Sequence, residues 1–140
     1  MSDQAEFVLD CSTTIAWMLE DESSQSANKA FDALATGRAW VPPLWRTETA
    51  NAMRSAFRSG RCTEKQALQK LSNLTIFDIQ ISPYDLGQME SNQILQFAHQ
   101  HDVTAYDAGY LYVAMQMQLP LATLDKNLRR AAKAAKARLI

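Results

Sequence analysis

Short apolar runs alternate along the chain with longer segments in which apolar residues recur every three or four positions. The run Phe7–Leu9 leads directly into Asp10, and a polar cluster that opens a helical pattern follows. This order is typical of a buried parallel strand followed by a helix. A further run at 39–41, before a pair of prolines, predicts a short strand, and one at 120–124, before Asp125, predicts a second buried strand.

Two weaker patterns complete the predicted strands. Phe77, Ile79 and Ile81 alternate with polar residues, which predicts a half-buried or edge strand over 75–81. Residues 137–140 could form a last short strand.

The segments between these strands carry helical periodicity and helix-start signals. Ser12 or Thr13 is the expected cap of the first helix, and Ser23–Ser24 begins the second. Thr63 and Gln66 form a capping-box pattern. The expected helices span residues 12–19, 23–36, 44–59, 63–71, 83–101 with a break near Gly87, 105–117 and 126–135. Strands that alternate with helices predict an α/β fold with a central, mostly parallel sheet.

Composition narrows the class of protein. A chain of 140 residues with 47% apolar residues can bury a core as a single domain over 1–140. The net charge of −1 gives no global attraction to nucleic acid, so a basic surface would have to be local. Cys11 and Cys62 are too few for a CxxC site or a disulfide framework. With no signal-peptide pattern and no apolar run near the roughly 20 residues that span a bilayer, we expect a cytoplasmic protein.

Two predicted parallel strands end in an aspartate, Asp10 and Asp125. Since parallel strand ends share one edge of a sheet, these two carboxylates are expected to lie close together. Each has a simpler interpretation. Asp10 could cap the turn after its strand, and Asp125, which precedes Lys-Asn-Leu, has the sequence of an ordinary helix N-cap.

Two helical acids extend this group. Glu48 falls at the margin of the buried stripe of its helix, where it could also reach solvent. Asp107 lies in the first turn of a helix that is apolar nearly all round, and a role at the helix start is its alternative. Four carboxylates near one sheet edge, without partnering His or Cys, predict Mg²⁺ or Mn²⁺ and a role in phosphodiester hydrolysis. Ser12 and Thr123 could orient a carboxylate there, or serve only as capping and strand residues.

These acids fall within four short motifs in order along the chain. The motifs are Val8-Leu-Asp10-Cys-Ser12, Glu48-Thr-Ala-Asn51, Tyr106-Asp107-Ala-Gly-Tyr-Leu-Tyr-Val-Ala114 and Ala122-Thr123-Leu-Asp125. Together they resemble the PIN-domain ribonucleases, and among these the VapC-type toxins of bacterial toxin–antitoxin pairs. The resemblance runs from about Phe7 to Ile140.

The resemblance implies a three-layer α/β/α fold, Mg²⁺ or Mn²⁺ dependence, RNA cleavage, a homodimer and a cognate antitoxin. It assigns the metal and the catalysis to Asp10, Glu48, Asp107 and Asp125, with Ser12, Asn51 and Thr123 as supporting polar residues. The chain departs from the family before its last strand, where 134–137 lacks the glycine that relatives often have. This departure concerns the final turn rather than the site.

Basic residues flank the acids. The functional interpretation is a surface that contacts RNA phosphates, and a solvated helix face is the alternative for each residue. The candidates are Arg54, Arg58, Lys126, Arg129 and Arg130. Two other functions remain open. A non-catalytic PIN-like module that binds RNA or a partner is one. An aspartyl-phosphate phosphatase is the other, although Ser12 stands where that chemistry needs an acid.

Overall fold

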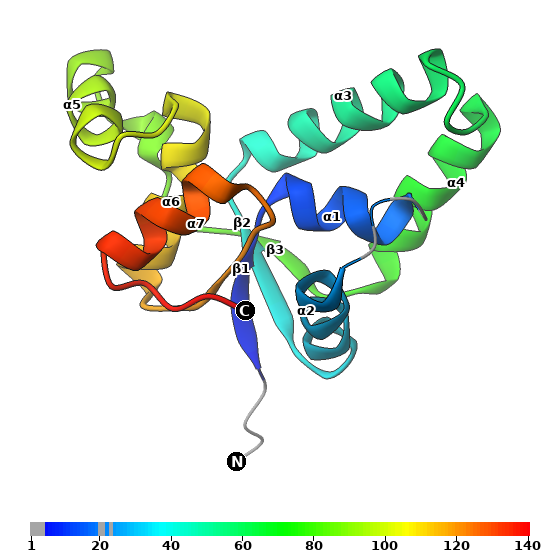
Figure 1. Cartoon of the computed structure of the whole chain (residues 1–140), viewed down its shortest axis with the longest axis horizontal. Helices are drawn as coiled ribbons and strands as arrows, with labels where there is room; N and C mark the ends of the chain where they lie inside the picture. Colours follow the sequence, from blue (N-terminus) through cyan, green and yellow to red (C-terminus); the bar gives the residue numbers. More distant parts are fainter. Residues whose placement is uncertain (1–4, 20–21, 23) are drawn as a thin grey trace.

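The computed structural model describes residues 5–19, 22 and 24–140, and within these a central sheet lies between two layers of helices (Figure 1). Its strands are β1 (Glu6–Leu9), β2 (Arg38–Val41), β3 (Ile79–Ile81) and β4 (Leu121–Ala122). All pairings are parallel, in the order β3-β2-β1-β4. The prediction of a mostly parallel sheet in a three-layer α/β/α fold is confirmed.

Strand position in the sheet explains the sequence patterns. β1 has a neighbour on both sides, and Phe7, Val8 and Leu9 are almost completely buried. A strand covered on both faces requires an unbroken apolar run. β3 lies at the edge, and there Ile79 and Ile81 are half-buried around the exposed Gln80. The alternating pattern therefore correctly predicted an edge strand.

Helices cover both faces of the sheet (Figure 1). α6 packs on β1, β2 and β4, while α2 packs on β2 and β4. α1 packs against both α2 and α3, and α7 packs on α6. The helices are α1 (Cys11–Met18), α2 (Gln25–Thr36), α3 (Leu44–Arg58), α4 (Glu64–Asn73), α5 (Ser91–His101), α6 (Ala105–Met117) and α7 (Lys126–Ala134), with short 3₁₀ turns η2 (Leu74–Ile76) and η3 (Leu86–Gln88).

Local sequence signals fix several boundaries as expected. Thr63 and Gln66 form both hydrogen bonds of the capping box at the start of α4. The Ser24 hydroxyl accepts from the backbone N–H of Ala27 and caps α2. Gly37 ends α2, where a Cβ would lie 2.1 Å from the carbonyl oxygen of Ala5. The return of the chain to the sheet therefore requires glycine at this position.

Four predicted boundaries are wrong. Only Ile79–Ile81 of the strand predicted over 75–81 pairs with β2, because 74–76 form a 3₁₀ turn. The helix predicted from 83 begins at Ser91, after η3. The strand predicted over 120–124 is confined to Leu121–Ala122, and that over 137–140 is a single parallel bridge between Leu121 and Leu139.

The start of the first helix also differs from the prediction. Asp10 occupies the N-cap position, although its side chain makes no capping hydrogen bond. Ser12 lies inside the helix, and its hydroxyl donates to the carboxylate of Asp10 instead of capping the helix. The sequence also predicts that this helix ends in the exposed acids Glu20, Asp21 and Glu22. Glu20 and Asp21 lie outside the described residues, as does Ser23 at the predicted start of the second helix. Among the described helices, none is long and apolar enough to cross a membrane.

Candidate active site

Four separate segments place their acids at the carboxyl-terminal edge of the sheet. Asp10 follows β1, and Asp125 follows the adjacent strand β4. Glu48 lies on α3, one turn from the helix start. Asp107 lies in the first turn of α6. These four side chains are close enough for their charges to influence one another, since Asp107 experiences the charges of the other three.

Asp10 is buried, with 4% of its surface exposed, and two hydroxyl groups hold it. Ser12 Oγ donates to Asp10 Oδ2 at 2.7 Å, and Thr123 Oγ1 donates to the same oxygen at 2.5 Å. Burial raises the pKa of Asp10, and the nearby charge of Asp125 adds to this effect. The two hydroxyl hydrogen bonds oppose the rise, because they favour the charged form.

Backbone groups set the direction of these hydroxyl protons. The N–H of Leu124 donates to Ser12 Oγ at 2.9 Å, and the N–H of Asp125 donates to Thr123 Oγ1 at 3.1 Å. Each hydroxyl therefore accepts from the backbone and directs its own proton to Asp10. Ser12 and Thr123 thus orient a carboxylate, which is one of the two interpretations that the sequence left open. Asp10 occupies the N-cap position of α1, but its side chain is bound by these hydroxyls and makes no capping hydrogen bond.

Glu48 is half-buried and receives a hydrogen bond from a buried phenol. Tyr110 Oη donates to Glu48 Oε1 at 2.9 Å. Burial raises the pKa of Glu48, and the charge of Asp10 raises it further against the opposing effect of Tyr110. Burial also raises the pKa of Tyr110, followed by the charges of Asp10 and Glu48, so that its hydroxyl remains a proton donor.

Asp107 is half-buried, and its pKa is raised as well. The helix N-cap is Thr104, whose Oγ1 accepts from the backbone N–H of Asp107 at 3.1 Å. The predicted alternative of Asp107 as the cap is therefore wrong. Burial raises the pKa of Asp107 to about 6, and after it the charges of Asp10, Asp125 and Glu48 contribute, against a hydrogen bond with Thr104.

Asp125 does cap its helix. Its Oδ1 accepts from the backbone N–H of Leu128 at 2.8 Å at the start of α7. The capping interpretation accounts for this oxygen, and the charge of Asp125 still acts on Asp10 and Asp107. A structural role and a place in the acidic group therefore coexist in one side chain.

Tyr110, Thr49 and Cys11 surround the acids but were missed from the sequence. Thr49 donates to Cys11 Sγ at 3.8 Å, and burial raises the pKa of this thiol to about 12, so it stays protonated. The sequence treats Tyr110 as one more apolar residue of a buried helix. The only available signal was its position one turn after Asp107. The side chain of Asn51 is exposed and makes no hydrogen bond with another described residue.

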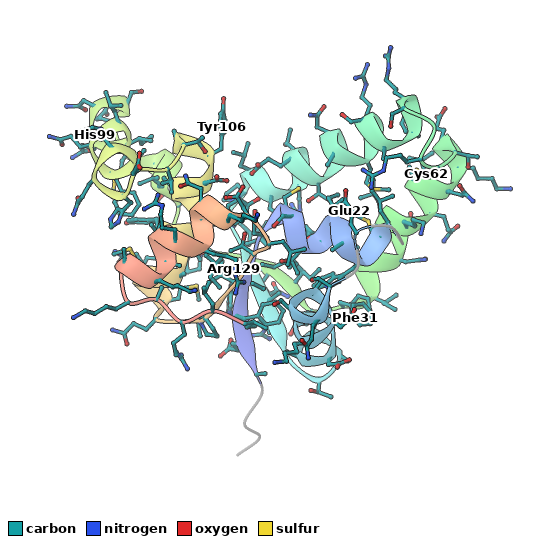
Figure 2. The ribbon with its side chains drawn as sticks, viewed as in Figure 1. Glu22, Phe31, Cys62, His99, Tyr106 and Arg129 are labelled. Atoms are coloured by element: carbon teal, nitrogen blue, oxygen red, sulfur yellow. The ribbon has the colours of Figure 1, made fainter. Side chains whose placement is uncertain are left out.

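The basic candidates divide into two groups. Arg129, a residue of α7, donates to the carbonyl of Thr123 at 2.9 Å (Figure 2). Arg130 donates to the carbonyl of Asp102 at 2.7 Å, which ties α7 to the end of α5. In contrast, three side chains are exposed and make no hydrogen bond or ion pair with another described residue: Arg54, Arg58 and Lys126.

The acids suit a hard divalent cation by the chemistry of their donors. Their ligand atoms are all oxygens, and burial together with mutual repulsion raises the pKa of Asp10, Glu48 and Asp107. Hydrogen bonds, rather than cationic side chains, are the main contributions that lower these pKa values. Within the described ranges, no three His, Cys, Asp or Glu side chains already form a group that could hold a metal ion. Closing such a group would require side-chain movement.

Comparison with known proteins gives one family and two similar folds. The sequence pattern of the PIN domain matches residues 7–134. No curated protein sequence matches the chain significantly. PAE2754 from Pyrobaculum aerophilum is 24% identical, with a TM-score of 0.68 over 97% of this chain and 83% of that chain. FitAcB from Neisseria gonorrhoeae is 18% identical, with a TM-score of 0.61 over 96% of both chains. At these identities the two structures show likeness of fold alone.

Proposed function

The chain belongs to the PIN-domain family, and on this premise we propose that it is a metal-dependent ribonuclease that hydrolyses phosphodiester bonds. PIN domains are generally nucleases. RNA as the substrate, Mg²⁺ or Mn²⁺ as the cofactor and the assignment of the acids are our proposals. The observation that carries them is the convergence of four acids from separate segments, with raised pKa values in three of them.

The cation would be held by Asp10, Glu48, Asp107 and Asp125. Such an ion supplies neutralisation of phosphate charge and activation of the attacking water. The chain itself supplies orientation. Ser12 and Thr123 fix Asp10, while the bond from Asp125 to Leu128 fixes the start of α7. Because these anchoring groups lie at the start of α1, directly after β4 and at the start of α7, Asp10 and Asp125 are held by rigid elements.

A cleavage assay on total RNA tests this proposal. In Mg²⁺ the wild-type protein should cleave RNA, and EDTA should abolish cleavage. Asp10→Asn keeps the shape of the side chain but removes the charge, so activity should fall roughly 100-fold or more while the fold survives. Asp32→Asn, an exposed change on α2, is the matched control and should cleave normally. Full activity in folded Asp10→Asn protein would remove Asp10 from the site.

We also propose that the protein is the toxin of a type II toxin–antitoxin pair, a homodimer that binds a cognate antitoxin. The support is the resemblance of the four motifs to VapC-type toxins. Expression of the wild-type chain alone should arrest bacterial growth, and Asp10→Asn should relieve the arrest. An adjacent short reading frame whose product restores growth would identify the antitoxin. Normal growth with active, soluble protein would contradict the toxin role without contradicting the ribonuclease.

A non-catalytic PIN-like module that binds RNA or a partner is the second candidate. One observation favours it, namely that the described side chains do not already form a metal-binding group. The cleavage assay separates the two functions. A module would bind RNA and leave it intact in Mg²⁺, Mn²⁺ and EDTA alike.

A further inference from the structure

Tyr110 forms a hydrogen bond with Glu48 that the amino-acid sequence gives no reason to expect. The residue lies one helical turn after Asp107 on α6, so both side chains point to the same side of the helix. Its ring is completely buried, and its hydroxyl donates to Glu48 Oε1 at 2.9 Å. A buried phenol needs a hydrogen-bond partner, and a packed ring holds that partner in place.

Glu48 and Asp10 are therefore both restrained by hydrogen bonds from hydroxyl groups. On Asp10, both hydroxyl bonds reach Oδ2. On Glu48, the phenol occupies Oε1, and Oε2 receives no hydrogen bond from any described residue. The protein thus engages one oxygen of Glu48 and leaves the other without a hydrogen bond from a described residue.

This restraint distinguishes between cations of different size. Ca²⁺ accepts six to eight oxygens and readily takes both oxygens of one carboxylate, whereas Mg²⁺ requires near-octahedral geometry and few protein ligands. A glutamate whose Oε1 already accepts a hydrogen bond therefore suits Mg²⁺ better than Ca²⁺. We propose that Tyr110 is a positioning residue that keeps a single oxygen of Glu48 available and so makes the site prefer Mg²⁺ over Ca²⁺. This inference rests on the proposed function in so far as Glu48 is assigned to the cation.

Tyr110→Phe tests the proposal because it removes the hydroxyl and keeps the ring. Mg²⁺ and Ca²⁺ affinities should be measured by titration calorimetry on RNA-free protein. Loss of an outer partner typically weakens metal binding about 10- to 100-fold, and we expect this loss for Mg²⁺. Ca²⁺ affinity should change less than about threefold, since a released Glu48 can offer both oxygens. Equal losses for the two ions would indicate a general structural defect and overturn the proposal.

A double-mutant cycle shows whether Tyr110 acts through Glu48. In a Glu48→Gln background, Tyr110→Phe should weaken Mg²⁺ binding no further, because the carboxylate it positions is gone. Independent, additive losses would overturn the proposal. Tyr112→Phe is the matched control on the same helix. Its half-buried ring packs edge-on against Phe97 at 5.6 Å between centroids, and its loss of a hydroxyl should leave both affinities unchanged.

The wild-type protein separates failure of this inference from failure of the proposed function. If it binds Mg²⁺ and Asp10→Asn does not, the acidic site stands whatever Tyr110→Phe does. A Tyr110→Phe protein with wild-type selectivity then removes only the role of Tyr110. If the wild-type protein binds neither Mg²⁺ nor Mn²⁺, the metal site and the role of Tyr110 are both wrong.

Discussion

Asp107 is the residue at which the cost of gathering the acids is most visible. Its pKa of about 6 lies above its ordinary value of 3.8, with burial as the first cause and the neighbouring carboxylates as the next. The folded state therefore binds a proton more readily than the unfolded chain. Stability from this residue is present below about pH 3.8 and is lost as the pH rises through about 6.

Replacement of Asp107 with Asn should raise the melting temperature in EDTA near neutral pH. The change removes a charge that burial and repulsion disfavour. Because the side chain is half-exposed, solvent screening limits the gain to about 1 kcal/mol, or a few degrees in a domain of this size. Thermal melting from pH 3.5 to pH 7.5 measures it, and the difference from wild type should vanish at the acid end.

Metal addition provides the complementary measurement. Mg²⁺ or Mn²⁺ that binds only the native state stabilises the wild-type protein, and Asp107→Asn should reduce this stabilisation. Asp32→Asn, on exposed α2 surface, should behave as wild type in both conditions. If Asp107→Asn melts lower in EDTA and metal moves neither protein, the shared-cation site is wrong.

At the scale of single residues, the acids could be predicted from the sequence, but most of the groups that orient them could not. A carboxylate directly after an apolar run can be recognised in the sequence as a candidate site residue, because a carboxylate is costly to bury without a partner. Tyr110 and Thr49 carry no such signal, since a tyrosine or threonine in an apolar helix also fits a core position. The direction of the Ser12 proton depends on the backbone N–H of Leu124, which lies 112 residues away in the chain.

At the scale of single elements, the end of α7 contains a residue in an uncommon conformation. Lys136 has a φ of 61°, in the left-handed region, at the turn where the family often has glycine. The N–H of Ala137 donates to the carbonyl of Ala132 at 2.8 Å, and that of Lys136 to Lys133 at 3.0 Å. These two bonds form a Schellman motif, which glycine favours. The chain thus makes the turn with a lysine instead.

Lys136→Gly should therefore stabilise the protein. Release of the left-handed strain of about 1–2 kcal/mol, less the greater flexibility of glycine in the unfolded chain, leaves roughly 0.5–1 kcal/mol. Urea denaturation would measure the gain. Lys133→Gly, an exposed change within α7, is the control and should destabilise by about 0.5–1 kcal/mol. A loss of stability in both variants would show that the turn carries no strain.

The errors in the predicted strands arise because the hydrophobic pattern of a segment does not show whether a neighbouring strand is there to pair with it. Phe77 continues the alternation of Ile79 and Ile81, but only Ile79–Ile81 has a partner strand in β2. The last segment, 137–140, is apolar enough for a strand but forms only one bridge. The capping box of Thr63 and Gln66 and the helix α6 were predicted well, because their signals lie within one helix. Strand length depends on the neighbouring strand, which local sequence does not specify.

At the scale of the whole molecule, exposed cations extend from the acids along α3. With a rise of 1.5 Å per residue, Arg54 and Arg58 lie about 9 and 15 Å along the helix axis from Glu48. Tyr106, 65% exposed, projects from the start of α6 next to Asp107 (Figure 2). Since the net charge is only −1, attraction for RNA depends on such local surfaces.

Replacement of Arg54 and Arg58 with Ala should weaken RNA binding and flatten its salt dependence. Each lost phosphate contact should reduce the slope of log affinity against log salt by roughly 0.7–0.9. The measurement should use Asp10→Asn protein, which is expected to bind RNA without cutting it. These residues are more informative than Arg129 and Arg130, which bond to the backbone of Thr123 and Asp102.

Lys29→Ala, on exposed α2 surface, is the control and should leave the slope unchanged. An unchanged slope in the double Arg variant would assign α3 to antitoxin contacts, dimer contacts or solvation. Lys126→Ala, at the start of α7, tests the second basic surface separately.

The bond between Thr123 and Asp10 joins groups 113 residues apart, and β4 completes the sheet beside β1. On the ribosome, β1, β2 and β3 emerge long before β4. A partly synthesised chain can therefore carry Asp10, Glu48 and even Asp107 while Thr123 and Asp125 have not yet been added. For the ribonuclease proposed above, cutting ability appears only late in translation. A chain that is still being synthesised is thus not expected to cut the messenger that encodes it.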